Sequence, residues 1–182
     1  MTVLINFLGS PGVGKTSLCA KLFASMKARD MNVEFVQEHI KSWVYENKAV
    51  NKYSQYTIFG IEVENQSRLF NKVDFVISDA PITLVCFYNF YYNKGDKSLN
   101  EACREFYRKT SEDNVKVVNF FLQRQKDYDQ RGRYQTQEES DRLSKILQAW
   151  LNFEGYNYYD LKCSDEERLT KVIECLKNEG VL

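Results

Sequence analysis

Histidine, proline and an excess of charge of one sign are scarce or missing in this sequence. Among 182 residues there is one histidine, His39, and there are two prolines, Pro11 and Pro81. Lys and Arg together number 25, as do Asp and Glu, so the formal net charge is zero. Proteins that depend on the phosphate backbone for affinity usually carry a basic excess. Its absence argues against tight, non-specific nucleic-acid binding, although it leaves room for a local basic patch.

Closely spaced cysteine pairs and long apolar runs are also missing. No two of the five cysteines form a CxxC pair, and one histidine is too few for a Cys/His metal site, so reduced thiols are expected. The first ten residues contain no basic segment and predict a core strand, not a signal peptide. No apolar run approaches the roughly 18 residues that span a membrane. We therefore expect a cytoplasmic protein with no membrane partner.

Short apolar runs alternate with longer amphipathic segments along the chain. The runs that predict strands are Val3–Leu8, Val33–Val36, Val73–Ser78, Val115–Leu122 and Tyr156–Tyr159. The segments that predict helices are Lys15–Ala28, His39–Asn47, Gln55–Asn71, Thr83–Tyr92, Asn100–Lys109, Thr136–Asn152 and Ser164–Lys177. Such alternation is typical of an α/β fold with a parallel sheet between two helical layers. We predict about five parallel strands in one domain, residues 1–182.

The segment Gly9–Thr16 has the spacing G-x-x-x-x-G-K-[ST] at every fixed position. Its glycines let backbone N–H groups approach an anion, and the helix that follows directs its positive N-terminal end to the same place. Lys15 is expected to neutralise the β- and γ-phosphates, and Thr16 to offer a hydroxyl to Mg²⁺. The predicted nucleotide-binding residues are Gly9, Pro11, Gly12, Val13, Gly14, Lys15, Thr16 and Ser17.

A phosphate loop alone does not separate GTPases, motor ATPases and small kinases. Two NKxD segments, Asn71–Asp74 and Asn93–Asp96, resemble the guanine-reading motif of GTPases. The first leads into a predicted strand and the second follows a predicted helix, whereas the GTPase motif lies at a strand end, so ATP is the expected nucleotide. Motor ATPases generally carry an acidic pair after the Walker B strand, but here Asp79 is followed by Ala80.

Three features favour a kinase. Glu38 follows the second predicted strand and Asp79 ends the third, and ligands collect at the carboxyl ends of parallel strands. Glu38 could accept the proton of an attacking hydroxyl, while Asp79 could bind Mg²⁺ or act on the acceptor. Arg124, Arg131 and Arg133 follow the fourth strand, where an arginine-rich lid over residues 124–135 could close on the transferred phosphoryl group.

In this order of features the chain resembles small P-loop nucleoside and nucleotide kinases. Glu38, Ile40 and Trp43 after the second strand, and Arg131–Arg133 before a helix, are similar to deoxyribonucleoside kinases. The order also resembles ribosylnicotinamide kinases and phage-encoded P-loop kinases, including those that phosphorylate hydroxymethyl pyrimidines in DNA. The resemblance implies a P-loop kinase fold, Glu38 as base, Asp79 and Thr16 at Mg²⁺, and a phosphate clamp of lid arginines. The Glu/Asp-Arg-Ser triplet of nucleoside kinases is replaced by Asp79–Pro81.

A planar acceptor needs stacking and hydrogen-bonding partners, which are available after the predicted strand ends. The predicted acceptor-binding residues are Glu38, Trp43, Tyr56, Phe59, Gln66, Arg68 and Phe87, with Tyr53, Gln55 and Tyr88 as further candidates. The aromatic run Phe87–Tyr92 cannot bury every ring on one helix. Some of these rings must face a cavity, a partner or solvent, and a homodimer contact is one possibility.

Three functions stay open on the sequence. The first is ATP- and Mg²⁺-dependent phosphorylation of a nucleoside, nucleotide or related small molecule. The second keeps this chemistry but makes the acceptor a modified base in DNA, of the 5-hydroxymethyluracil type. The third is a nucleotide-dependent regulatory ATPase without a small acceptor, whose activity would survive the loss of Glu38.

Overall fold

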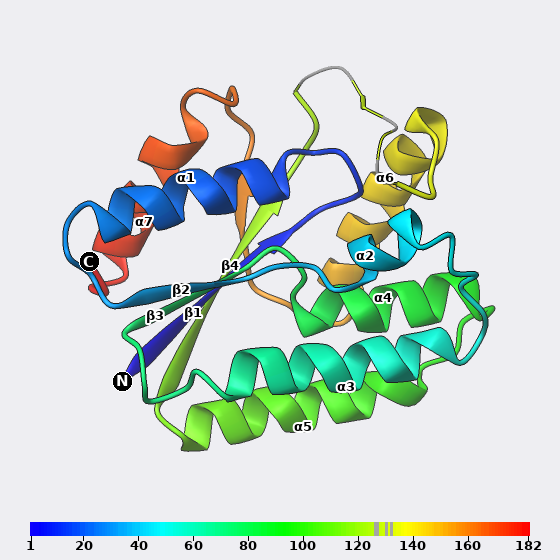
Figure 1. Ribbon diagram of the computed structural model, residues 1–182, viewed down its shortest axis with the longest axis horizontal. Coiled ribbons are helices and arrows are strands. Elements are labelled where there is room, and N and C mark those ends of the chain that lie inside the picture. The colour runs from blue at the N-terminus through cyan, green and yellow to red at the C-terminus, as the bar shows by residue number, and fades with distance from the viewer. Residues whose placement is uncertain (126–127, 130, 132) are drawn as a thin grey trace.

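A five-stranded, all-parallel sheet forms the centre of the molecule in the computed structural model, which describes residues 1–125, 128, 129, 131 and 133–182 (Figure 1). The strands lie in the order β2-β3-β1-β4-β5, and every neighbouring pair is parallel. Their bounds are β1 Thr2–Leu8, β2 Val33–Val36, β3 Phe75–Ser78, β4 Val115–Leu122 and β5 Tyr159–Leu161. The predicted α/β class and parallel sheet are confirmed.

Helices cover both faces of this sheet. Their bounds are α1 Lys15–Lys27, α2 Ile40–Tyr45, α3 Ser54–Ser67, α4 Ile82–Tyr92, α5 Ser98–Glu112, α6 Gln137–Phe153 and α7 Arg168–Asn178. Figure 1 shows α1 and α7 on one face and α3, α4 and α5 on the other. Two large apolar clusters match these layers, since one joins the sheet to α1 and α7 and the other joins it to α3, α4 and α6.

The central strand β1 shows why the chain folds as three layers. All seven of its residues are buried. Because successive side chains of a strand point to opposite faces, Ile5 and Phe7 enter the α1/α7 cluster while Leu8 enters the cluster on the opposite face. Thr2 and Asn6 are the polar residues of the strand, and the Asn6 amide donates to the Asn119 side chain at 3.0 Å on the neighbouring strand β4. A strand buried on both faces is typical of a parallel sheet.

Several predicted boundaries were wrong by a few residues. The fifth strand lies at Tyr159–Leu161 instead of Tyr156–Tyr159, because Gly155 at φ +79° and the Tyr156 N–H bond to the Leu151 carbonyl still belong to the end of α6. Helix α7 begins at Arg168, after a turn that the predicted range from Ser164 had included. The capping box at the start of α6, Thr136 with Glu139, is confirmed.

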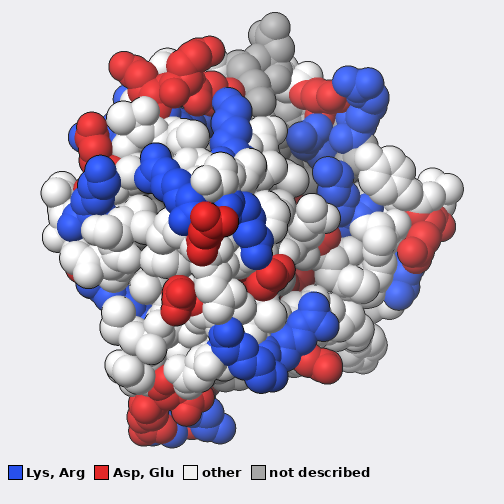
Figure 2. Space-filling view, turned by 60° about the vertical axis from the view of Figure 1, so that its left-hand side comes forward, with Lys and Arg blue, Asp and Glu red and all other residues white. Residues whose placement is uncertain are grey.

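The carboxyl ends of the strands lie at one edge of the sheet, which brings four functional segments together. The phosphate loop follows β1, Glu38 follows β2, Asp79 follows β3, and the segment from Arg124 follows β4. Figure 2 shows Lys and Arg interspersed with Asp and Glu across the face it presents. Within the described residues, no helix combines the length and apolarity needed to cross a bilayer.

Candidate active site

The phosphate loop adopts a conformation that its glycines permit. Gly12 and Gly14 have φ values of +81° and +96°, in the left-handed region that L side chains rarely adopt. Gly14 is the N-cap of α1, so the first turn of this helix faces the inside of the loop. A Cβ atom on Gly12 would lie 2.6 Å from the Tyr128 ring. Backbone N–H groups and a helix N-terminus directed at one point form a binding site for phosphate.

Two buried side chains on other helices donate hydrogen bonds to the backbone carbonyls of this loop. The Ser140 hydroxyl on α6 donates to the Pro11 carbonyl at 2.5 Å, and the Arg168 guanidinium on α7 donates to the Val13 carbonyl at 2.8 Å. Both side chains are almost completely inaccessible to solvent. Neither was predicted from the sequence, because a serine and an arginine inside amphipathic helices give no signal of their long-range partners.

Lys15 lies at the centre of the loop. Its ammonium group donates to the carbonyls of Gly9 at 2.8 Å and Ser10 at 3.1 Å. Burial lowers the pKa of Lys15, while the nearby carboxylates of Glu38 and Asp79 act in the opposite direction. This buried cation is therefore close to two acidic side chains, and it lies in the loop that would bind a phosphate.

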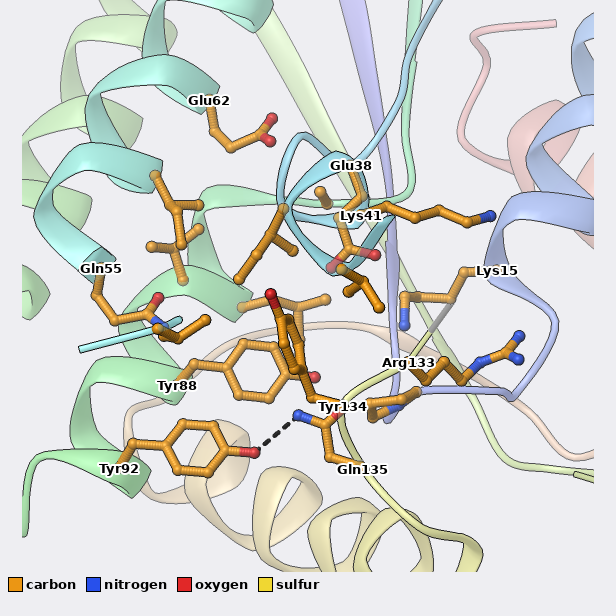
Figure 3. Close-up of a pocket in the computed structure, with 18 of the residues that line it drawn as sticks. Lys15, Glu38, Lys41, Gln55, Glu62, Tyr88, Tyr92, Arg133, Tyr134 and Gln135 are labelled. Atoms are coloured by element: carbon orange, nitrogen blue, oxygen red, sulfur yellow. Dashed lines mark hydrogen bonds between the residues drawn. The ribbon is translucent and has the colours of Figure 1, made fainter. Parts of the chain in front are cut away.

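Glu38 and Asp79 are joined at the ends of β2 and β3. The Glu38 backbone N–H donates to the Asp79 carboxylate at 2.8 Å, and Asp79 is buried. Burial raises the pKa of Glu38, and Asp79 adds to this effect, whereas the Lys15 charge lowers it. Figure 3 shows the Glu38 and Lys15 side chains directed toward one another across the cavity.

The three predicted lid arginines have different surroundings. Arg133 lines the cavity beside the phosphate loop, and its guanidinium carbon lies 5.5 Å from the centre of the Tyr128 ring. Arg124 forms an ion pair with Asp141 on α6. Arg131 is exposed and pairs with Asp129 at 2.8 Å. The described part of the lid thus brings Arg133 into the cavity, while Arg131 lies outside its lining. Gly132, where we expected the lid to bend, lies outside the described residues.

A cavity of about 900 Å³ extends from the phosphate loop between α3 and α4. Gln55, Ile58 and Glu62 of α3 line one wall, and Leu84, Val85, Tyr88 and Tyr92 of α4 line the other. The Tyr134 hydroxyl donates to the Lys48 carbonyl at 2.8 Å, and the Gln135 amide donates to the Tyr92 hydroxyl at 2.8 Å. Tyr134 and Gln135, at the end of the lid, are thereby bonded to two different segments beside the cavity, and Figure 3 shows the bond between Gln135 and Tyr92.

Six of the predicted acceptor-binding residues lie outside the lining of this cavity. Trp43 and Phe87 are buried in the core, Phe59 packs against that core, and Gln66 donates to the Ala80 carbonyl at 3.4 Å. Tyr56 bonds to Ser98 at 2.7 Å on α5, and Arg68 is exposed at the end of α3. The rings that do line the cavity are Tyr88, Tyr92 and Tyr134. The expectation that the aromatic run faces more than one environment agrees with this division.

Glu62 is a site residue that sequence reasoning missed. Its side chain is completely buried on α3, and it accepts a hydrogen bond from the His39 N–H at 3.1 Å. Burial, reinforced by Glu38 and Asp79, raises its pKa to about 7. One available signal was its spacing of seven residues from Gln55, which places both on one face of a helix.

The comparisons with known proteins agree with this geometry. The family model described as AAA domain matches residues 4–168, which is most of the chain. The chain belongs to this AAA-domain family of P-loop proteins. No protein with a curated description matches it by sequence.

Solved structures resemble this AAA-domain chain in fold. One is described as the crystal structure of NadR protein in complex with NR, with 17% identity and a TM-score of 0.70. The match covers 97% of this chain and 51% of NadR, so the chain spans about half the length of that protein. Another is the crystal structure of APE1195, with 14% identity, a TM-score of 0.50 and coverage of 97% and 95%. These likenesses support a P-loop kinase-like fold.

Proposed function

We propose that the protein transfers the γ-phosphoryl group of ATP to a hydroxyl of a small, nucleoside-like molecule. The observation that carries the proposal is that Lys15 of the phosphate loop and Glu38 face one cavity, which continues past them between α3 and α4. A donor phosphate on the loop and an acceptor hydroxyl at Glu38 would meet inside this cavity. NadR was solved in complex with NR, nicotinamide riboside, and a ligand of that size supports a small, nucleoside-like acceptor here.

The residues divide the work of transfer between them. Glu38 would take the proton of the acceptor hydroxyl as its oxygen attacks the γ-phosphorus and the bond to ADP breaks. Lys15 and Arg133 would neutralise the charge that develops on the transferred group. Because burial raises the pKa of Glu38, the ionised base is lost at a higher pH than for an ordinary glutamate, so activity should fall as pH drops through that raised pKa.

We expect two oxygen donors, Thr16 and Asp79, to serve a nucleotide-bound Mg²⁺. The Thr16 side chain is exposed to the cavity in the first turn of α1, and Asp79 lies at the end of β3. The described residues contain no group of three or more His, Cys, Asp or Glu side chains that could hold a metal. A nucleotide-bound Mg²⁺ does not require one, because it takes most of its ligands from phosphates and water. Thr16 and Asp79 would hold the ion, directly or through water, and the ion would screen the phosphate charge.

The test is transfer of labelled γ-phosphate from ATP to a panel of acceptors. The panel holds nucleosides, nucleoside monophosphates, nicotinamide riboside, and DNA with and without 5-hydroxymethyluracil. Lys15→Met and Glu38→Gln are expected to reduce transfer by roughly a hundredfold or more. Lys21→Met, an exposed lysine on α1, is the matched control and should keep full activity.

Each result separates the functions that the sequence left open. Label on a small acceptor, lost in both site variants, supports the proposal and names the acceptor. Label found only on modified DNA would mean that the acceptor is a base in DNA and not a small molecule. ATP hydrolysis without a labelled acceptor, undiminished in Glu38→Gln, would make the protein a regulatory ATPase and contradict the proposal.

A further inference from the structure

Glu62 has an unsatisfied carboxylate oxygen in the wall of the cavity. The side chain is 0% exposed, and Oε1 accepts the His39 N–H at 3.1 Å. Oε2 is buried and has no hydrogen-bond partner among the described residues. A buried carboxylate oxygen without a hydrogen-bond partner lowers the stability of the folded protein. A bound ligand that donates a hydrogen bond to this oxygen would remove that cost.

The position of Glu62 separates it from the other buried polar atoms that lack partners. In the described part of the chain these atoms belong to Asn6, Gln66, Asn100, Arg124, Trp150 and Arg168. All six residues lie outside the lining of the large cavity, whereas Glu62 is part of that lining. An acceptor molecule in the cavity would lie against this wall, and a small rotation of the buried Glu62 side chain toward the cavity would bring its carboxylate into contact with it.

The charges around Glu62 are negative. Glu38 and Asp79 both raise its pKa, in addition to the larger effect of burial. The backbone N–H of His39, the residue just before α2, donates a hydrogen bond to Glu62. Lys15 and Lys41 act on Glu38, and Lys15 lies on the side of the phosphate loop. The inner end of the acceptor cavity is consequently acidic.

We propose that Glu62 selects the acceptor by charge, favouring molecules that present a positive charge or a hydrogen-bond donor to it and disfavouring molecules that carry a phosphate. The proposal rests on the phosphoryl-transfer function above and deepens it. It distinguishes a free nucleoside-like acceptor from a nucleotide. A cation at this carboxylate gains attraction in a poorly solvated site, while an extra phosphate meets repulsion from the acidic side chains.

The walls near Glu62 fit the uncharged body of such an acceptor. Gln55, Ile58 and Glu62 follow one another on one face of α3, and Glu62 lies seven positions after Gln55, or about 10 Å along the helix. Leu84 and Tyr88 of α4 line the opposite wall. A flat apolar ring could lie between these walls with its polar groups at the two ends.

The test compares two acceptors that differ by one charge. Nicotinamide riboside carries a positive ring, and its reduced form is uncharged with nearly the same shape. The KM for each is measured at saturating ATP near pH 8, and nicotinamide mononucleotide is added as a competing ligand. We expect wild type to prefer the cation by about tenfold, and Glu62→Gln to reduce this ratio toward one. Glu64→Gln, an exposed glutamate on the same helix, is the control and should keep the ratio.

The two proposals fail in different ways. The role of Glu62 would be overturned if wild type and Glu62→Gln showed the same charge preference. It would also be overturned if the mononucleotide competed as strongly as the riboside binds. Either result would leave the kinase function intact. If neither riboside is phosphorylated, equilibrium binding of the same pair by calorimetry decides the charge preference separately. Glu62→Gln keeps an oxygen for the His39 N–H, and a thermal unfolding scan verifies its folding.

Discussion

The two ends of the cavity are built in different ways. The donor end is one continuous loop, Gly9–Thr16, in which backbone groups and the start of α1 surround a single lysine. The end proposed to hold the acceptor is made of side chains from α3, α4 and Tyr134–Gln135, segments that are distant in the chain. Substitutions at the donor end should therefore act on any nucleotide-dependent reaction, while substitutions at the acceptor end should act on the choice of acceptor.

The largest effect is expected at Arg133. Arg133→Ala removes the described lid arginine that lines the cavity beside the phosphate loop, and should lower kcat by about 10²–10³-fold because charge on the transferred group loses its partner. Arg131→Ala is the matched control, since Arg131 is exposed and pairs with Asp129. Steady-state kinetics with varied ATP measure both. Equal losses in the two variants would contradict the different roles assigned to these arginines.

A smaller effect concerns the stability cost of Glu62. The unfolded chain releases this proton near the ordinary value of 4.5, whereas the folded chain holds it until about pH 7. The free energy of unfolding of the wild type should therefore fall as pH rises between these values, by up to about 3 kcal/mol. Urea denaturation at about pH 5 and about pH 8 measures the change. Glu62→Gln should lack this part of the pH dependence, whereas the control Glu64→Gln should keep it. If the two variants had the same pH dependence, the raised pKa would not belong to Glu62.

A change at Gly12 tests whether the donor end depends on its backbone. Gly12→Ala places a methyl group against the Tyr128 ring, at a φ of +81° that alanine adopts with strain of about 1–2 kcal/mol. ATP affinity should fall about tenfold, as measured by calorimetry. Acceptor affinity should stay the same. A parallel loss of acceptor affinity would show that the two ends are not independent.

The smallest effect is expected at Gly60, which lies inside α3 and has open space where a Cβ atom would be added. Gly60→Ala should raise the free energy of unfolding by about 0.5–1 kcal/mol, because glycine loses more backbone freedom than alanine when a helix forms. Thermal unfolding measures the change. Catalytic constants equal to those of the wild type are expected, and altered acceptor KM values would mean that α3 shifts during the reaction.

Parts of the site were predictable because the signal was local. Lys15, Glu38 and Asp79 follow apolar runs that form parallel strands, and the ends of such strands meet at one edge of the sheet. The cavity walls were less predictable. Trp43 and Phe87 have the same sequence signal as Tyr88, but the first two are buried in the core and Tyr88 lines the cavity. Which ring faces which side depends on how α2 and α4 rotate against the sheet.

The fold class, the phosphate loop and the strand-end carboxylates could all be read from local sequence patterns. These features depend on contiguous residues, on the two-residue period of strands and on backbone conformations that only glycine adopts easily. Two other features are visible only in the folded structure: Arg133 and not Arg131 lines the cavity, and Glu62 is a buried carboxylate in its wall. The physical reason is that burial and electrostatic environment arise from helices that meet only after folding, so a glutamate in the middle of α3 cannot be distinguished beforehand from its exposed neighbour Glu64.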